Sequence, residues 1–487
     1  MVMPRLDLGR YLGEHEYAER IEAAVSNRIV GGFCVFNGAA SDAKQVISKL
    51  RAIHPQEHLL FSIDAEWGAT MRLRGDVTEF PHARAIAESS FPRAAYLSGL
   101  AIGSELKAIG IDWDFAPVLD INSDPDNPII NIRSFAEDSD TVITNASEFI
   151  RGLTESRVLT SGKHFPGHGE TKTDSHNSLP VLDVTPEVFA SRELVPFIAI
   201  IDKGISSIMT GHLAAPKLAR SLGASDEEAM LAATLSPFLI QKLLREKLGY
   251  NGVVVTDSLE MASVKALTGS DAVSCELAVR AGCDMLLMPT EFEESYRHLC
   301  SLAAHDSAFA GLVERSSARI ASFISRIQDK KTEYSLEDHR ELSFSIAKGA
   351  INVKGNIEHL SRIRRVVLAT NDPSGQKRLD LLREELQRIM PEMLVVSESE
   401  LTVENRGSSA IIYAQRPIGK LVDGETSKGN ATEFLSRYRG MVSCIILLGN
   451  PYLSKNLSVS DTCIVRTFSD SVPSIQALAA FLAEARK

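Results

Sequence analysis

The segment SGKHFPGHGETKTDSHNSLP, residues 161–180, carries the densest group of titratable side chains in the chain. The proline and the glycines of its HFPGHG portion disfavour a regular helix, which predicts a long, shaped loop. Within it, Asp174 stands two residues before His176, close enough in a turn for a carboxylate–imidazole hydrogen bond. Such a pair orients the ring and raises its basicity, so the segment indicates acid/base chemistry more than a structural histidine.

The same loop also permits a metal-site hypothesis, because three histidines and one aspartate could supply ligands. The spacing of His164 and His168 would place both rings on one face of a helix. The intervening Phe-Pro-Gly interrupts any such helix. The favoured interpretation is therefore chemistry without a metal and without an organic cofactor.

A second candidate group is Asp257, in the segment VVVTDSLEMASV at residues 253–264. The valines and Thr256 predict a buried strand that ends at this aspartate. A lone aspartate there could simply cap the following helix. Because the chain also carries a His–Asp pair, we interpret Asp257 as a catalytic carboxylate. A carboxylate facing an acid/base group across a sugar is the minimal set for glycoside cleavage with retention.

The elements that must position these groups alternate along the first two thirds of the chain. Helical patterns over 93–109, 139–156, 236–247 and 260–281 separate short apolar, β-branched runs. The strand–helix repeat predicts a (β/α)8 TIM-type barrel with one irregular strand. A doubly wound open sheet would alternate similarly, but no GxGxxG follows any strand. The predicted strands are 29–36, 58–64, 111–117, 158–165, 205–212, 252–257 and 283–289.

Ionisable residues recur at the ends of these predicted strands. Because the carboxyl ends of parallel strands meet at one face of a barrel, we expect these side chains to line one site. Three aspartates, Asp112, Asp114 and Asp120, cluster around the third strand. The other strand-end residues are Asp64, Lys163, His164, His212 and Asp257.

Two domains are expected from the length of 487 residues. We assign residues 1–335 to the barrel and residues 345–487 to a smaller three-layer αβα domain. Between them, IQDKKTEYSLEDHRE (327–341) is interpreted as a linker and the start of a helix. The later region shows apolar runs such as RRVVLATND, SAIIYAQR and SCIILLGNP and closes on the helical pattern SIQALAAFLAEARK.

The composition of the chain limits the classes of binding partner that we expect. A net charge of −11 argues against nucleic acid and anionic membranes, which require concentrated positive charge. No run of eighteen or more apolar residues occurs, so no membrane span is expected. The six cysteines form no CxxC pair, and the N-terminal residues lack a continuous apolar region. These features favour a cytoplasmic protein and give no indication of oligomeric state.

The motifs KHFPGHGETKTDSH and TDSLEM resemble the glycoside hydrolase family 3 β-N-acetylglucosaminidases, the NagZ-type enzymes. The segments GGFCVFNG, IDAEWGATMRL, GIDWDFAPVLDIN, NIRSFAED, MTGHLAAP and AGCDMLLMP follow the family's order, and LLGNPY resembles the C-terminal α/β domain of many members. The resemblance implies a retaining β-N-acetylhexosaminidase. Its substrate would be an N-acetylglucosamine-containing oligosaccharide or muropeptide, with cell-wall fragments favoured.

By this resemblance Asp257 is the nucleophile, and His176 with Asp174 supplies acid/base catalysis. One segment departs from the family, because this chain has DAEWGATMR where DQEGGRVQR is common. Trp67 within it would either offer an aromatic face to the sugar or pack beneath the loop. The residues matching the family's sugar-binding set are Asp64, Arg72, Arg133, Lys163, His164 and His212.

Four alternatives stay open on the sequence. A β-glucosidase or β-xylosidase of the same family would generally lack the HGxTxxDSH segment that this chain carries. A phosphorylase is conceivable because a neutral imidazole does not repel an incoming anion. A non-catalytic sugar-binding barrel would be expected to lose Asp257 or the His–Asp pair. A metal-dependent hydrolase would lose activity on chelation.

Overall fold

The computed structural model describes residues 1–171, 179–327, 334–370, 373–402, 404–415, 431–438, 441–457 and 462–486. The chain forms two compact units. The barrel unit comprises Met1–Val77, Gly99–Asn127 and Ala136–Tyr334, and the sandwich unit comprises Thr78–Ser98, Pro128–Phe135 and Ser335–Lys487. Two short segments from the first part of the chain therefore group with the sandwich unit.

The strands of the barrel unit are short and parallel. They are β1 (Val2–Met3), β2 (Arg5–Asp7), β3 (Gly32–Phe36), β5 (Leu60–Ile63), β7 (Trp113–Asp114), β8 (Leu159–Phe165), β9 (Ser207–Thr210), β10 (Val253–Val255) and β11 (Leu286–Leu287). The main sheet has the order β10-β9-β8-β7-β5-β3-β2. The sheet continues through a parallel bridge from Val255 to Met285, and β11 pairs with β1. The curled parallel sheet thus returns to the N-terminal strand, which confirms the predicted TIM-type fold.

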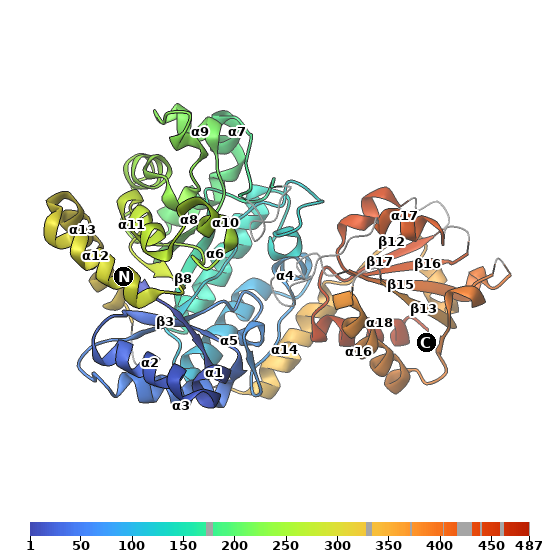
Figure 1. Ribbon diagram of the computed structural model, residues 1–487. Helices are drawn as coiled ribbons and strands as arrows, with labels where there is room; N and C mark the ends of the chain where they lie inside the picture. Colours follow the sequence, from blue (N-terminus) through green and yellow to red (C-terminus); the bar gives the residue numbers. More distant parts are fainter. Residues whose placement is uncertain are drawn as a thin grey trace. The chain divides into compact units, whose positions relative to one another are not determined.

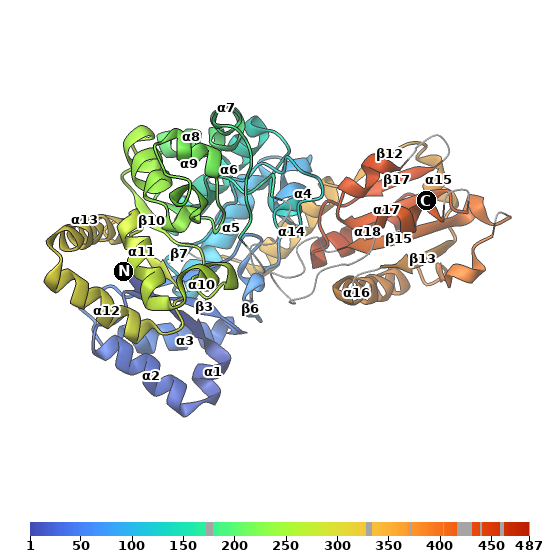
Figure 2. The same ribbon diagram turned by 45° about the horizontal axis from the view of Figure 1, so that its top comes forward.

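Helices surround these strands on the outside (Figure 1, Figure 2). The predicted helix over 260–281 is in fact two helices. Gly269 ends the first in the left-handed region at φ 76°, and the Ser270 hydroxyl caps the second by accepting from the Val273 N–H at 3.3 Å. The helices are α1 (Leu8–Gly13), α2 (His15–Ser26), α3 (Ala40–Arg51), α5 (Ala94–Ile109), α6 (Ser139–Glu155), α7 (Pro186–Val188), α8 (Val195–Asp202), α9 (Pro216–Ser221), η6 (Phe238–Lys247), α10 (Ala262–Thr268), α11 (Asp271–Ala281), α12 (Phe292–His305) and α13 (Ser307–Ile324).

Aromatic packing fills one end of the barrel interior. Trp113 is fully buried and meets Phe115 and Phe323 edge to face, with ring centroids 4.8 and 4.7 Å apart. Its indole N–H donates to the Ser207 hydroxyl at 3.0 Å, so the one polar atom of the ring is satisfied inside the core. The barrel is therefore a packed core and leaves functional groups to its ends.

A buried carboxylate, Asp284, ties strands to helices at the amino end of β11. It accepts hydrogen bonds from Arg245 at 2.7 Å and from Arg319 at 2.7 and 2.9 Å. The Ser316 hydroxyl at 2.7 Å and the Val254 N–H at 2.9 Å complete the set. Such a carboxylate is stable inside the protein because all its acceptor positions are matched by donors.

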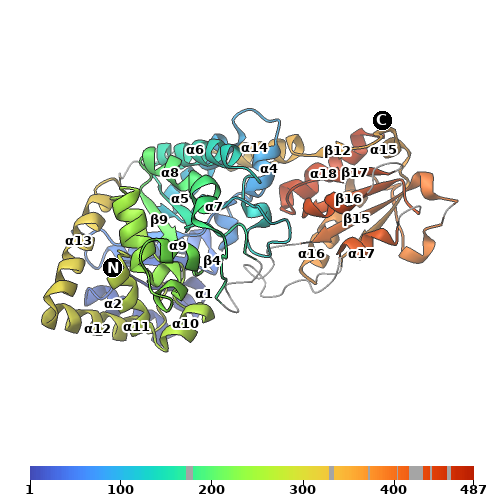
Figure 3. The same cartoon turned by 90° about the horizontal axis from the view of Figure 1, so that it is seen from above.

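The sandwich unit is built on a six-stranded sheet of order β12-β17-β16-β15-β13-β14, in which β12 alone is antiparallel to its neighbour. The strands are β12 (Asn352–Lys354), β13 (Arg365–Ala369), β14 (Leu394–Val395), β15 (Ser409–Gln415), β16 (Cys444–Gly449) and β17 (Cys463–Arg466). Its helices, visible from above in Figure 3, are α4 (Ala83–Glu88), α14 (Leu336–Gly349), α15 (Glu358–Arg362), α16 (Pro373–Ile389), α17 (Ala431–Ser436) and α18 (Val472–Glu484).

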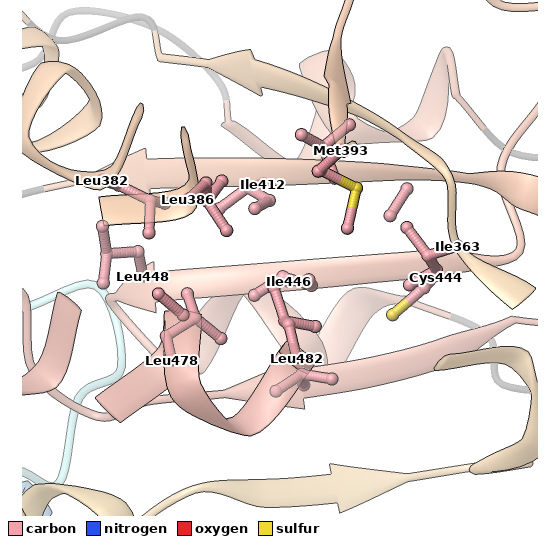
Figure 4. Close-up of a cluster of buried hydrophobic side chains, with 14 of the residues drawn as sticks. Ile363, Leu382, Leu386, Met393, Ile412, Cys444, Ile446, Leu448, Leu478 and Leu482 are labelled. Carbon is pink, nitrogen blue, oxygen red and sulfur yellow. The ribbon is translucent and has the colours of Figure 1, made fainter. Parts of the chain in front are cut away.

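Alternation along β15 divides the sandwich unit into two apolar layers. Ile412 packs in one cluster with residues of α16 and α18, such as Leu382 and Leu478 (Figure 4). Its neighbour Ile411 belongs to the cluster on the other face, together with Leu435 of α17. Helices on both faces of a parallel sheet give the three-layer αβα arrangement that the sequence pattern predicts.

No helix within the described parts of the chain is long and apolar enough to cross a membrane.

Asp284→Asn is expected to lower the free energy of unfolding of the barrel unit by about 3 kcal/mol, because two partly buried guanidinium groups would lose their buried carboxylate. Urea unfolding followed by tryptophan fluorescence measures this, since both tryptophans, Trp67 and Trp113, lie in the barrel unit. The control is Glu14→Gln, which removes an exposed ion pair with Arg10 and should leave the free energy of unfolding nearly unchanged. Equal losses in the two variants would contradict the anchoring role.

Candidate active site

Five of the predicted site residues stand at the carboxyl ends of four barrel strands. Asp64 directly follows β5, and Lys163 and His164 lie near the carboxyl end of β8. His212 comes two residues after β9, and Asp257 comes two residues after β10. Because these strands are parallel and closely spaced in the sheet, their carboxyl ends share one face of the barrel. The barrel unit thus brings these side chains to a single region.

A buried lysine holds the first part of this region together. The Lys163 ammonium is 2% exposed and donates to Asp64 Oδ1 at 3.0 Å and to Glu66 Oε1 at 2.7 Å. Arg72 donates to the other oxygen, Asp64 Oδ2, at 2.9 Å, while its guanidinium lies 4.6 Å from the centre of the Phe36 ring. Burial opposes ionisation of Asp64, but Lys163 and Arg72 outweigh it and lower the pKa of Asp64 to about 2.

Asp120 fixes the orientation of the His164 ring. Its Oδ2 accepts a hydrogen bond from His164 Nδ1 at 2.7 Å, and its oxygens also accept the backbone N–H groups of His164 and His168. Burial opposes the charge of Asp120, yet these interactions outweigh it and lower its pKa. A carboxylate fixed in this way sets both the tautomer and the plane of the His164 ring.

His212 is held at both ring nitrogens. Nε2 lies 2.8 Å from the Ser258 carbonyl oxygen, and Nδ1 lies 2.9 Å from the Thr234 hydroxyl. A carbonyl oxygen only accepts, so Nε2 carries a proton and donates. This bond connects the loop after β9 to the residue that follows Asp257, so His212 positions the candidate nucleophile's loop.

Asp257 is only partly buried, whereas most of its neighbours are fully buried. Its Oδ1 accepts the Ser258 N–H at 2.7 Å. Burial opposes its ionisation, but the positive fields of His212, His164 and Lys163 and the Ser258 N–H lower its pKa. The arrangement therefore supplies an ionised, accessible carboxylate surrounded by cationic groups.

The described part of the loop after β8, at His168 and Gly169, is closely packed against neighbouring backbone. Asn127 donates to the carbonyl oxygens of His168 and Gly169, each at 2.9 Å. A Cβ at Gly169 would lie only 1.6 Å from the Ile121 carbonyl oxygen, so this position requires glycine. The backbone before the predicted His–Asp pair is thus fixed against the loop after β7.

The structure does not assign every predicted residue to this region. Asp174 and His176 lie outside the described residues, so their roles stay predictions. Arg133 belongs to the sandwich unit, in η2 (Asn131–Arg133), where it is buried and donates to the Ile129 carbonyl oxygen at 3.2 Å. Trp67 is 3% exposed, which fits packing beneath the loop better than an open aromatic face.

The prediction that three aspartates cluster at the carboxyl end of β7 is wrong for Asp112. Asp114 and Asp120 lie toward the carboxyl end, but Asp112 precedes β7 and accepts from Arg51 and from the Phe61 N–H. The strand is two residues long, so a shift of two positions moves a side chain from one end to the other. Asp112 is therefore a structural anchor at the amino end.

Two contributors were underweighted by sequence reasoning. Glu66 shares Lys163 with Asp64, and its position two residues after Asp64 was the available signal. Thr234, which holds His212, lies in a 3-10 turn, η5 (Ala233–Leu235), and carries no local motif. Supporting groups of this kind come from segments that only the fold brings together.

Two other observations concern a separate cavity and possible metal ligands. A cavity of about 700 Å³ lies at the amino ends of β8 and β9, and none of the predicted site residues lines it. Among the residues that the structure describes, no group of three or more histidine, cysteine, aspartate or glutamate side chains is arranged to hold a metal ion.

Known proteins share this architecture. The family described as Glycosyl hydrolase family 3 N terminal domain matches residues 3–323. Beta-hexosaminidase A of Pseudoalteromonas piscicida is 31% identical over 358 residues, covering 67% of this chain and 60% of that protein. The Beta-N-acetylglucosaminidase/beta-glucosidase of Cellulomonas fimi is 30% identical over 344 residues, covering 70% of this chain and 58% of that protein. The chain thus spans less than two thirds of the length of these relatives.

One solved structure aligns over nearly the whole chain. It is a glycoside hydrolase family 3 beta-N-acetylglucosaminidase from Paenibacillus sp. str. FPU-7, with a TM-score of 0.80 and 26% sequence identity. The alignment covers 99% of this chain and 95% of that one, so both units have counterparts in a single known protein.

Lys163→Met is expected to lower the free energy of unfolding by about 3 kcal/mol near neutral pH, because Glu66 would lose its buried lysine and Asp64 would keep only Arg72. The loss should shrink as the pH falls from about 7 toward about 4, since the variant's carboxylates can then take up protons. Urea unfolding followed by tryptophan fluorescence measures both effects.

The matched control for this variant is Lys49→Met, which removes an exposed lysine paired with Glu22. It should leave the free energy of unfolding nearly unchanged at every pH, because the pair is exposed to solvent. A pH-independent loss in Lys163→Met would contradict the charge-balance explanation of the cluster.

Proposed function

The chain belongs to glycosyl hydrolase family 3, and from this we propose that it is a retaining β-N-acetylhexosaminidase releasing terminal β-linked N-acetylglucosamine. The observation that carries the proposal is Asp257, an accessible carboxylate at the end of β10 whose pKa is lowered by its cationic surroundings. An ionised carboxylate in such a position is suited to attack an anomeric carbon. The names of the aligned hexosaminidases support the choice of sugar.

The first step forms a covalent intermediate. A carboxylate oxygen of Asp257 attacks the anomeric carbon while the bond from that carbon to the leaving oxygen breaks. His176 gives its proton to that oxygen, and Asp174 orients the ring and stabilises its charged form. The cationic groups around Asp257 keep it ionised at neutral pH, so it needs no separate base.

The second step releases the sugar. His176, now neutral, takes a proton from a water molecule whose oxygen attacks the same carbon, and the bond to Asp257 breaks. Two displacements leave the product in the β configuration. No metal and no organic cofactor takes part in these steps.

The charged cluster under the sugar would fix its orientation. Asp64 is ionised and held by Lys163 and Arg72, so it offers a rigid acceptor to sugar hydroxyls. His164, set in plane by Asp120, would contact a neighbouring hydroxyl. Cell-wall fragments and chitooligosaccharides both present this terminal sugar.

Asp257→Ala is expected to lower kcat for p-nitrophenyl N-acetyl-β-D-glucosaminide at least about a thousandfold, because the covalent step loses its nucleophile. Added azide should restore turnover and give the α-configured glycosyl azide, since azide would occupy the face that Asp257 used. The control Asp226→Ala alters a 91% exposed carboxylate paired with Arg220 and should leave kcat unchanged. A fully active Asp257→Ala would overturn the assignment of the nucleophile.

The same assay with p-nitrophenyl β-D-glucoside decides the sugar. A wild type that prefers the glucoside would contradict the hexosaminidase proposal in favour of a glucosidase. Adding inorganic phosphate decides the acceptor, because a phosphorylase would release the sugar 1-phosphate in place of the free sugar.

His176→Ala is expected to slow substrates with poor leaving groups far more than p-nitrophenyl substrates, because p-nitrophenolate departs with little help from a proton donor. We expect a loss of about a thousandfold in kcat for a chitooligosaccharide and a much smaller loss in the first step for the p-nitrophenyl sugar. His15→Ala, at an exposed histidine, serves as control. Equal losses on both substrates would argue against His176 as the general acid.

A further inference from the structure

Asp114 is a buried carboxyl group that the proposed steps do not use. It ends β7, pairs with Ile63 of β5 in the parallel ladder, and is 0% exposed. Its Oδ1 accepts the Ala65 N–H at 3.0 Å. Its Oδ2 has no hydrogen-bond partner among the described residues. A buried carboxylate normally has all its oxygens matched by donors, so this one is unusual.

The surroundings of Asp114 are already balanced in charge. The ionisable groups that act on it are Lys163 on β8 and the two carboxylates Asp64 and Glu66 after β5. Arg72 supplies the second cation of the cluster. Burial, opposed by Lys163 and reinforced by Asp64 and Glu66, raises the pKa of Asp114 to about 8.

The backbone bond of Asp114 has a specific consequence. Ala65 is the residue between Asp64 and Glu66, so fixing its N–H fixes the peptide from which both carboxylates project. Both carboxylates form ion pairs with the Lys163 ammonium. Asp114 therefore acts on the ion cluster through one hydrogen bond, without touching the sugar.

We propose that Asp114 is a positioning residue for sugar binding, which through its bond to the Ala65 N–H holds Asp64 and Glu66 around Lys163. Ionisation of Asp114 would weaken this arrangement. This inference rests on the proposed function. A third carboxylate beside one ammonium would draw that ammonium away from the sugar hydroxyls. Because this contact serves substrate and transition state alike, the effect falls on KM more than on kcat.

The test compares Asp114→Asn with the wild type across pH, using p-nitrophenyl N-acetyl-β-D-glucosaminide. Wild-type KM should rise about tenfold between about pH 7 and about pH 9.5 with little change in kcat. A change of this size corresponds to the loss of one charge-assisted hydrogen bond. Asp114→Asn keeps an oxygen to accept the Ala65 N–H and cannot ionise. Its KM should stay within about threefold of the neutral wild-type value at every pH.

Two further variants separate positioning from mere packing. Asp114→Ala removes the acceptor for the Ala65 N–H and should raise KM about tenfold even at neutral pH. Asp112→Asn changes another buried aspartate near the same strand, at the amino end, and should leave the wild-type pH dependence of KM intact. An alkaline rise in KM that persists in Asp114→Asn would overturn the proposal, as would equal behaviour of the Asn and Ala variants.

A second measurement needs no substrate. The folded wild type keeps a proton on Asp114 that the unfolded chain releases above about pH 4, so its stability relative to Asp114→Asn should fall as pH rises to about 8 and level off beyond. Tryptophan-monitored unfolding of both proteins measures this difference. A difference that does not vary with pH would overturn the neutral form of Asp114. A wild type inactive on the sugar substrate would instead contradict the proposed function and leave this measurement valid.

Discussion

The buried ammonium of Lys163 is the interaction on which the candidate site depends. An isolated ammonium in a protein interior costs several kcal/mol, so it persists only with close carboxylates. Asp64 and Glu66 supply these from a single tripeptide after β5, while the lysine comes from β8, with β7 between them in the sheet. The charges therefore meet only when β5, β7 and β8 pair in register, so this part of the site is assembled as the sheet forms.

The two ends of the barrel use charge for different purposes. At the amino end, Asp284 and Asp112 are matched by arginines, whose planar guanidinium groups saturate carboxylate oxygens and leave little to a ligand. At the carboxyl end, Lys163 and Arg72 share Asp64, two histidines are held in fixed orientations, and Asp257 keeps part of its surface accessible. The first arrangement is suited to stability and the second to chemistry, as expected for this fold.

Much of this arrangement could be predicted from local patterns, and the failures have physical causes. All seven predicted barrel strands exist, because apolar β-branched runs ending in polar residues are a strong local signal. The eighth, β1 with β2, was not predicted, since it is broken by Pro4 and gains its burial only from pairing across the barrel closure. Asp112 was placed at the wrong end because a two-residue strand gives the pattern almost no length. Thr234 carries no local signal, because its contact with His212 depends on tertiary structure.

Protonation states lie furthest beyond what a sequence can show. Asp64 and Asp114 are the same residue type at the carboxyl ends of neighbouring strands, yet their pKa values are driven apart, to about 2 and about 8. The difference arises because two cations, Lys163 and Arg72, suffice for two carboxylates, and a third carboxyl group in the same buried space must keep its proton. Asp64 receives both cations directly, whereas Asp114 receives one backbone N–H. Environments that separate like groups in this way are typical of sites that handle protons or hold charged ligands, because each group then has one fixed state at neutral pH.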